Sequence, residues 1–70
     1  MLRLTRVRTK KGWSQSRLSK ESGVHVSSIS AIERGRLNPW PGQVQRIAEA
    51  LEWQGNPTAL LEDVTDDARD

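Results

Sequence analysis

The chain has 70 residues, a formal net charge of +2 and no cysteine, and 34% of its residues are hydrophobic. This length allows one small hydrophobic core, and the lack of cysteine excludes disulfides, a thiolate nucleophile and a cysteine-ligated zinc site. A small domain without such cross-links depends on tight packing, usually of helices. No apolar stretch approaches the roughly 18 residues that a membrane span needs, and the first residues lack the apolar run of a secretory signal. We therefore expect a cytoplasmic protein with no membrane partner.

Charge is divided unevenly along the chain. Residues 1–46 contain ten basic and two acidic residues, whereas residues 47–70 contain one basic and seven acidic residues. The basic part fits a polyanion such as nucleic acid, and it fits a solvated cationic surface equally well. We expect one domain over residues 1–64, followed by a frayed acidic tail over residues 65–70 that aids solubility or interacts with the protein itself.

Two short helices are predicted first. Leu4 and Val7 share one face of a helix over about residues 2–11, which ends at Gly12. Ser14 is a good N-cap for a second helix that runs to about Glu21 and buries Leu18. Gly23 then allows a tight turn, because glycine adopts positive φ without strain.

A third helix is predicted over about Val26–Arg34. His25 stands at its N-cap position, and the spacing of Val24 and Ile29 is that of a hydrophobic staple. On a helical wheel, Ile29 and Ile32 share the inner face. The outer face carries small or polar side chains, namely Val26, Ser27, Ser30, Ala31 and Arg34.

The remaining helices follow a proline-containing loop. Pro39 and Pro41 disfavour helix before them, and Pro41 suits the first turn of a fourth helix over residues 41–52. The apolar residues of this helix, spaced at i, i+3, i+4 and i+7, are Val44, Ile47, Ala48 and Leu51. Asn56 and Pro57 begin a last short helix that carries Leu60, Leu61 and Val64. With no segment of period two, the chain is predicted to be all-α with five short helices.

The second helix, the Ser22-Gly23-Val24 turn and the third helix together predict a helix-turn-helix. The run KGWSQSRLSKESGVHVSSISAIERGRLNP resembles the Cro-type (XRE family) helix-turn-helix of phage repressors and small bacterial regulators. The matching features are the K-G-W-S-Q start, the S-G-V turn, I-S-A-I-E-R-G, the basic-x-Asn-Pro exit and the later A-x-A-L. This resemblance implies a lambda-repressor-like DNA-binding domain over nearly the whole chain.

The resemblance also assigns roles by position. Gln15 matches a residue that touches a phosphate and braces a base-reading side chain, and Glu33 matches a structural residue that bonds back to the scaffold. Positions that face DNA in the family correspond to His25, Val26, Ser27, Ser30 and Ala31, and positions of phosphate or helix-end contacts correspond to Arg34, Arg36 and Asn38. The complete predicted DNA-binding set is Gln15, Arg17, His25, Val26, Ser27, Ser28, Ser30, Ala31, Arg34, Arg36 and Asn38.

Several of these residues have a second interpretation. Val26 and Ala31 suit thymine methyl groups and the serines suit several bases. The alternative is that Val26 belongs to the core and that Ser27 and Ser30 are solvated serines. Many relatives carry Gln, Arg or Asn early in the third helix, so readout here is expected to depend more on Arg34, Gln15 or DNA shape. Trp40 replaces the usual Ser or Thr cap of the fourth helix, and it either packs on the loop or touches DNA or a partner. Trp13 and Trp53 are expected at the core or its edge.

The function predicted is a sequence-specific regulator of transcription that binds double-stranded DNA, with the helix over residues 26–34 in the major groove. A homodimer on a two-fold operator is expected. The apolar residues of the C-terminal part form either the dimer interface or the closure of the monomer core. These residues are Trp53, Leu60, Leu61 and Val64.

The alternative functions are an antitoxin-like interaction protein with a protein partner, and a non-specific nucleic-acid coating protein. A lone histidine, without a nucleophile–base pair or a phosphate loop, predicts no metal, no cofactor and no enzymatic activity.

Overall fold

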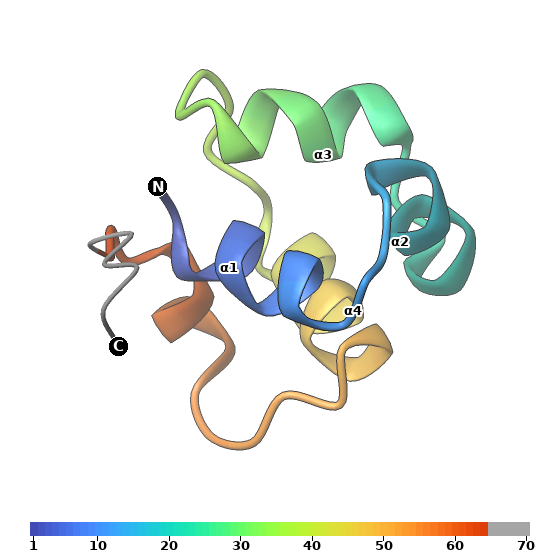
Figure 1. The fold of residues 1–70 in the computed structure, drawn as a ribbon. Helices are drawn as coiled ribbons and strands as arrows, with labels where there is room; N and C mark the ends of the chain where they lie inside the picture. Colours follow the sequence, from blue (N-terminus) through green and yellow to red (C-terminus); the bar gives the residue numbers. More distant parts are fainter. Residues whose placement is uncertain (65–70) are drawn as a thin grey trace.

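A computed structural model describes residues 1–64 of the chain. Four α-helices and one 3₁₀-helix follow one another in the order α1 (Arg3–Lys10), α2 (Gln15–Ser22), α3 (Val26–Glu33), α4 (Pro41–Ala50) and η1 (Pro57–Leu61). Figure 1 shows α3 lying across one side of the molecule, with α1 and α4 beneath it and α2 at its N-terminal end. No strand occurs within the described range, so the all-α prediction is confirmed.

All five elements contribute to a single core. The helical spacing of α4 buries three apolar side chains along one face, and Leu51, directly after the helix, continues it, as the sequence predicts. Leu18 of α2 and Ile29 of α3 are fully buried where these two helices meet. The complete set of buried apolar residues is Leu4, Leu18, Val24, Ile29, Ile32, Val44, Ile47, Ala48, Leu51 and Leu60.

The beginning and end of α2 follow the predicted capping. The Ser14 hydroxyl accepts a hydrogen bond of 3.0 Å from the Arg17 backbone N–H, which satisfies one donor of the first turn. At the other end Gly23 adopts φ +77 and its N–H donates to the Ser19 carbonyl over 2.9 Å. The left-handed glycine reverses the chain into Val24, which is buried, and so fixes the approach of α3.

The fourth helix is shorter than predicted. It ends at Ala50 because Glu52 adopts the left-handed conformation, with φ 55, and the Trp53 N–H donates back to the Ala48 carbonyl over 2.9 Å. The chain therefore leaves the helix two residues before the predicted end at residue 52.

The fifth predicted helix forms as the short 3₁₀-helix η1, and Val64, which was predicted to belong to it, lies outside it. Asn56 caps it as expected, with its side chain accepting from the Thr58 N–H over 3.0 Å. Glu62 is extended and its carbonyl accepts from the Arg3 N–H over 2.8 Å, while the Val64 N–H donates to the Met1 carbonyl over 2.7 Å. Pairing with the first residues of the chain prevents the helix from continuing, since these backbone groups are already bonded. The predicted acidic tail over residues 65–70 lies outside the described residues.

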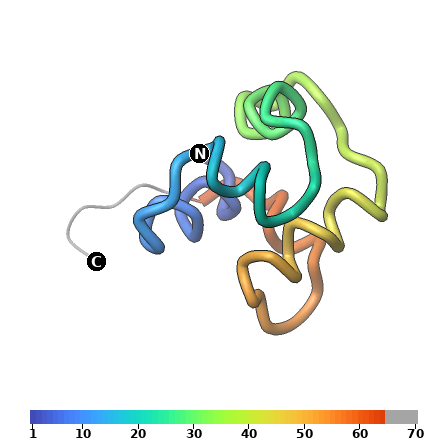
Figure 2. Tube along the Cα trace, turned by 90° about the vertical axis from the view of Figure 1, so that its right-hand side faces the viewer, coloured from blue at the N-terminus to red at the C-terminus, as the bar shows by residue number. Residues whose placement is uncertain are grey.

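The arrangement leaves α3 on the outside of the molecule. Figure 2, in which α3 is seen nearly along its axis, shows it projecting beyond α2 and the start of α4. None of the helices described for residues 1–64 combines the length and apolarity needed to cross a bilayer.

Candidate nucleic-acid interface

One face of α3 is open to solvent along its whole length. Ile29 and Ile32 are 0% and 1% exposed and hold the opposite face against the core. Val26 is 39% exposed, so it is a surface residue, and the interpretation of Val26 as a core residue is wrong. Of the other predicted DNA-facing residues in this region, His25 and Ser27 are exposed. Ser28, Ser30 and Ala31 are partly exposed.

The N-terminal turn of α3 offers unbonded backbone donors. His25 occupies the N-cap position as predicted, but its side chain accepts no capping hydrogen bond. The first intrahelical bond is that from the Ile29 N–H to the His25 carbonyl, 3.0 Å long. The N–H groups of the first turn, which carry the positive end of the helix dipole, therefore have no hydrogen-bond partner among residues 1–64.

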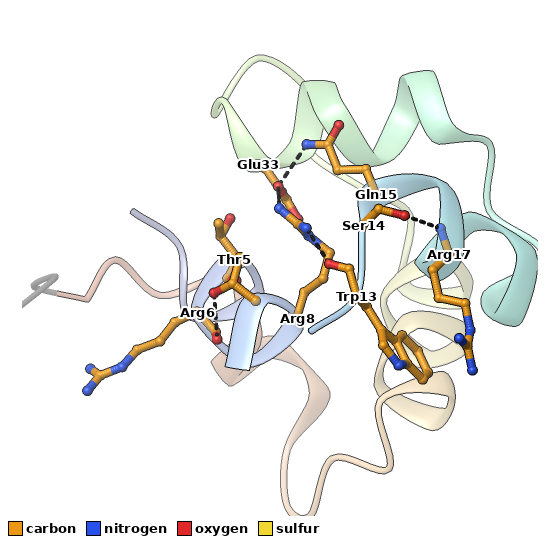
Figure 3. Close-up of polar contacts among 9 residues, drawn as sticks. Thr5, Arg6, Arg8, Trp13, Ser14, Gln15, Arg17 and Glu33 are labelled. Atoms are coloured by element: carbon orange, nitrogen blue, oxygen red, sulfur yellow. Dashed lines mark hydrogen bonds and ion pairs between the residues drawn. The ribbon is translucent and has the colours of Figure 1, made fainter. Parts of the chain in front are cut away.

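The C-terminal end of α3 is held by Glu33. Arg8 of α1 donates from Nε to Glu33 Oε2 over 2.8 Å and from its terminal nitrogen Nη2 to Oε1 over 3.0 Å (Figure 3). The side chains are only 11% and 6% exposed. A third guanidinium bond, of 2.7 Å, reaches the Trp13 carbonyl. This buried pair joins α1, the α1–α2 loop and α3, and it agrees with the structural role implied for Glu33.

Gln15 completes the same cluster from α2. Its amide nitrogen donates to Glu33 Oε1 over 2.9 Å, and Figure 3 shows the side chain bridging the start of α2 and the end of α3. The residue that Gln15 braces is thus Glu33, rather than a base-reading side chain on the outer face. The predicted phosphate contact of Gln15 stays a prediction.

Arg17 is placed away from the other predicted site residues. Its guanidinium lies 4.8 Å from the centre of the Trp13 ring, and its Nε donates to Glu21 Oε2 over 2.9 Å. In Figure 3 this side chain extends from α2 toward the side opposite α3. The structure therefore does not bring Arg17 to the α3 face, and its DNA contact stays a prediction without structural support.

A tight turn after α3 presents the remaining predicted residues. Gly35 has φ +76, its N–H donates to the Ile32 carbonyl over 3.0 Å, and the Arg36 N–H donates to the Ala31 carbonyl over 2.8 Å. These two bonds form a Schellman motif, which turns the chain sharply out of the helix. Arg34, Arg36 and Asn38 are all exposed in or just after this turn.

Internal contacts use several cations from the basic part of the chain. The Arg8 side chain is only 11% exposed, so it is not available to a polyanion. Its position four residues after Leu4, on the same side of the helix, was the signal for burial. Arg3 and Arg17 also have acidic partners. Within residues 1–64, the basic side chains with no ion pair are Lys10, Lys20, Arg34, Arg36 and Arg46.

The three tryptophans differ in environment. Trp13 and Trp53 pack partly buried against the core, as predicted. Trp40 is 75% exposed, so it does not pack on its loop. Its backbone N–H donates to Gln43 Oε1 over 2.9 Å, and this bond stabilises the start of α4 in place of a Ser or Thr cap.

The chemistry available on this face is binding chemistry. It combines small side chains, helix N-terminal donors and unpaired guanidinium groups, which suit phosphates and base edges. In the described part of the chain, no group of three or more His, Cys, Asp or Glu side chains is arranged to hold a metal ion.

Comparison with known proteins agrees with this geometry. A protein family described as "Helix-turn-helix" matches residues 4–52. A protein of Neisseria meningitidis serogroup B (strain ATCC BAA-335 / MC58), named "Neisseria hypothetical transcription factor", is 40% identical over 44 residues, which cover 63% of this chain and 42% of that protein. The match thus spans less than half of the relative's length. No solved structure matches the chain significantly. Because the family match covers α1 to α4 and more than half of the sequence, the chain belongs to the XRE-type helix-turn-helix family, a family of DNA-binding regulatory domains rather than enzymes.

Proposed function

We propose that this chain is a DNA-binding regulator of transcription that recognises specific sequences by placing α3 in the major groove. The observation that supports it best is the outer face of α3, which stays exposed while Ile29 and Ile32 anchor the opposite face in the core. The major groove of B-DNA admits one α-helix, and α3 lies at the outer edge of the molecule (Figure 2).

Base contacts in this proposal come from small side chains. Val26 and Ala31 offer methyl groups for thymine, and Ser27 and Ser30 offer hydroxyl groups that donate or accept hydrogen bonds. Because these side chains are short, the helix backbone approaches the base edges closely. Direct hydrogen-bonded discrimination is modest with such residues, so DNA shape contributes to sequence choice.

Phosphate contacts supply most of the affinity. Arg34, Arg36 and Asn38 lie just beyond the C-terminal end of α3, and the free N–H groups of the first turn lie at its other end. Both ends of the helix therefore carry groups that suit the two phosphate backbones bordering the groove.

A two-fold operator bound by a homodimer follows from the small size of this interface. One eight-residue helix makes few base contacts, and two copies double the readout. Half-sites are then expected about 34–36 Å apart, one turn of B-DNA.

Selection of bound sequences from a random duplex pool tests the proposal as a whole. The expected result is one enriched motif with two-fold symmetry, whose affinity falls as salt rises. With the five cations that have no ion pair within residues 1–64 as the available phosphate contacts, the slope of log K against log salt is expected at about −4.5 per monomer or shallower. No enriched motif, or an affinity independent of salt, would contradict it.

Replacement of Ser27 and Ser30 by alanine tests the role of α3. The double variant is expected to lose about tenfold of the preference for the selected motif over random DNA, because each serine contributes at most a modest hydrogen bond. Ser19→Ala is the matched control, since it removes a hydroxyl from α2 without altering the α3 face. If the double variant kept the same preferred motif and the same preference over random DNA, α3 would not be the element that reads the sequence.

A further inference from the structure

Trp40, at the start of α4, is the most exposed large hydrophobic side chain within residues 1–64. Its exposed fraction is 75%, against 45% or less for the other exposed residues of this kind. Its indole Nε1 forms no hydrogen bond within the described part of the chain, whereas Nε1 of Trp53 donates to the Asn56 carbonyl over 3.0 Å. Trp40 therefore has both an apolar ring and an N–H donor available to a partner.

The backbone at Trp40 is held in one conformation. Pro39 and Pro41 flank it, and the ring of each proline fixes its own φ. Trp40 itself is extended, with φ −66 and ψ 151, as a residue before proline favours. Its N–H donates to Gln43 Oε1 over 2.9 Å, and its carbonyl accepts from the N–H groups of Gln43 and Val44 over 2.9 and 3.1 Å. The position from which the indole leaves the backbone is thus set before binding, which lowers the entropy cost of a contact made by the ring.

The charges around Trp40 in the sequence favour an anionic partner. Residues 34–48 contain three arginines and no acidic residue. These arginines are exposed and have no ion pair within residues 1–64, and they are Arg34, Arg36 and Arg46. Unpaired guanidinium groups attract phosphates, and an indole beside them offers an apolar face to a deoxyribose and a donor to a phosphate oxygen.

The segment that carries Trp40 lies on the flank of α3. Figure 2, in which α3 is seen nearly along its axis, shows the α3–α4 loop descending beside α3 to the start of α4. A helix in the major groove, which is about 12 Å wide, has a sugar–phosphate backbone on each side. With α3 in the groove, the flank occupied by this loop therefore faces one of the two backbones.

We propose that Trp40 is a DNA-positioning residue, whose indole ring packs against a deoxyribose beside the major groove and whose Nε1 donates to a neighbouring phosphate. This inference deepens the proposed function and rests on α3 entering the groove. A contact with sugar and phosphate carries no base information. Trp40 therefore raises the affinity for every duplex, and the choice of sequence is left to α3.

The first test compares the affinities of Trp40 variants for the selected duplex and for a random duplex. Trp40→Ala is expected to raise Kd about tenfold for both, which is the order of loss on truncating an aromatic contact with nucleic acid. Trp40→Phe keeps a ring and loses the N–H, so its Kd is expected to rise about threefold. Neither variant loses a charge, so the slope of log K against log salt stays unchanged, whereas Arg36→Gln is expected to make it shallower by about 0.9.

Trp53→Phe is the matched control for these variants. It makes the same replacement in the loop between α4 and η1, which Figure 1 shows on the side of the molecule away from α3, and its Kd is expected to equal that of the wild type. Far-UV circular dichroism checks the fold of every variant. Wild-type affinity of Trp40→Ala for both duplexes overturns the inference. So does a loss confined to the selected duplex, because such a residue reads bases.

The second test observes Trp40 in the wild-type protein. Acrylamide, a neutral quencher, is added to free protein and to protein saturated with the random duplex, and the fluorescence that Trp40→Phe lacks is assigned to Trp40. DNA is expected to lower the quenching constant of this component by about half or more, because the ring face leaves the solvent. Unchanged quenching of this component in the complex overturns the inference even if the alanine variant does not fold.

Failure of this inference differs from failure of the proposed function. If DNA protects Trp40 and Trp40→Ala weakens binding, but no motif is selected from the random pool, sequence-specific recognition fails and the Trp40 contact stands. If a motif is selected and depends on Ser27 and Ser30, but Trp40→Ala binds like the wild type, the proposed function stands and the Trp40 contact fails.

Discussion

Glu33 connects the reading helix to the rest of the molecule through three side-chain hydrogen bonds. Two come from Arg8 and one from Gln15, and the carboxylate is almost completely buried. A bidentate pair at this depth fixes the rotation of α3 about its axis, since Glu33 immediately precedes the turn that ends the helix. Base contacts by the small side chains on the outer face depend on this orientation, because short side chains contact a base only when the helix is correctly placed.

Glu33→Gln is expected to destabilise the fold by about 3 kcal/mol, because it leaves the guanidinium of Arg8 buried without a counter-charge. Glu21→Gln is the matched control: it removes a carboxylate that also binds an arginine Nε, but this pair is exposed, and exposed pairs contribute about 0.5 kcal/mol or less. Urea denaturation of both variants measures the difference. Equal stability of the two would show that burial does not strengthen the Arg8–Glu33 pair.

The element that sets the direction of the chain after α3 is the turn at Gly35. Its left-handed backbone lets the N–H groups of Gly35 and Arg36 bond back to the last carbonyls of the helix. This turn leaves Arg36 exposed and leads the loop toward α4. The path of the α3–α4 loop therefore depends on the positive φ of Gly35 as much as on side-chain packing.

Gly35→Ala and Gly42→Ala are expected to act in opposite directions. A Cβ meets no atom within 4 Å at either position, so only the backbone differs. Gly35 has φ +76, and alanine there costs about 1 kcal/mol. Gly42 lies in α4, where alanine reduces the entropy of the unfolded chain and stabilises by about 0.5 kcal/mol. Thermal unfolding checks the signs, and two shifts of the same sign would contradict this account.

The whole molecule is closed by the pairing of its first residues with those after η1. The backbone bonds of Arg3 to Glu62 and of Val64 to Met1 hold η1 against α1, and this places Leu60 in the core at 1% exposure. Of the four residues considered as a dimer surface, Leu60 is therefore a core residue. Leu61, next to it, is partly buried and packs against the same core.

Leu60→Ala and Leu61→Ala compare a buried side chain of η1 with a partly buried one. Leu60→Ala is expected to lower the free energy of unfolding by about 2–5 kcal/mol, a large share of what a small domain has. Leu61→Ala is expected to lower it by about 1 kcal/mol, because this side chain is only partly buried. Urea denaturation of both variants measures the difference. A small effect of Leu60→Ala would show that η1 is not required to close the core.

Local interactions made most of the fold predictable from sequence. Helical spacing of apolar residues, the Ser14 and Asn56 caps and the glycines after α1, α2 and α3 depend on neighbours within a few positions, and the structure confirms them. The exposed face of α3 follows from the same periodicity.

Contacts between distant segments were decided by the tertiary structure alone. The Arg8–Glu33 pair joins residues 25 positions apart, and Arg3 and Glu62 are 59 apart; no local pattern contains either pairing. The termination of η1 also arises from pairing of the two ends of the described chain. Sequence determined which faces of the helices are apolar, because that depends on spacing along one chain. The packed structure determined which charges are neutralised inside the molecule and which are left to bind a partner, because burial and proximity exist only after the helices meet.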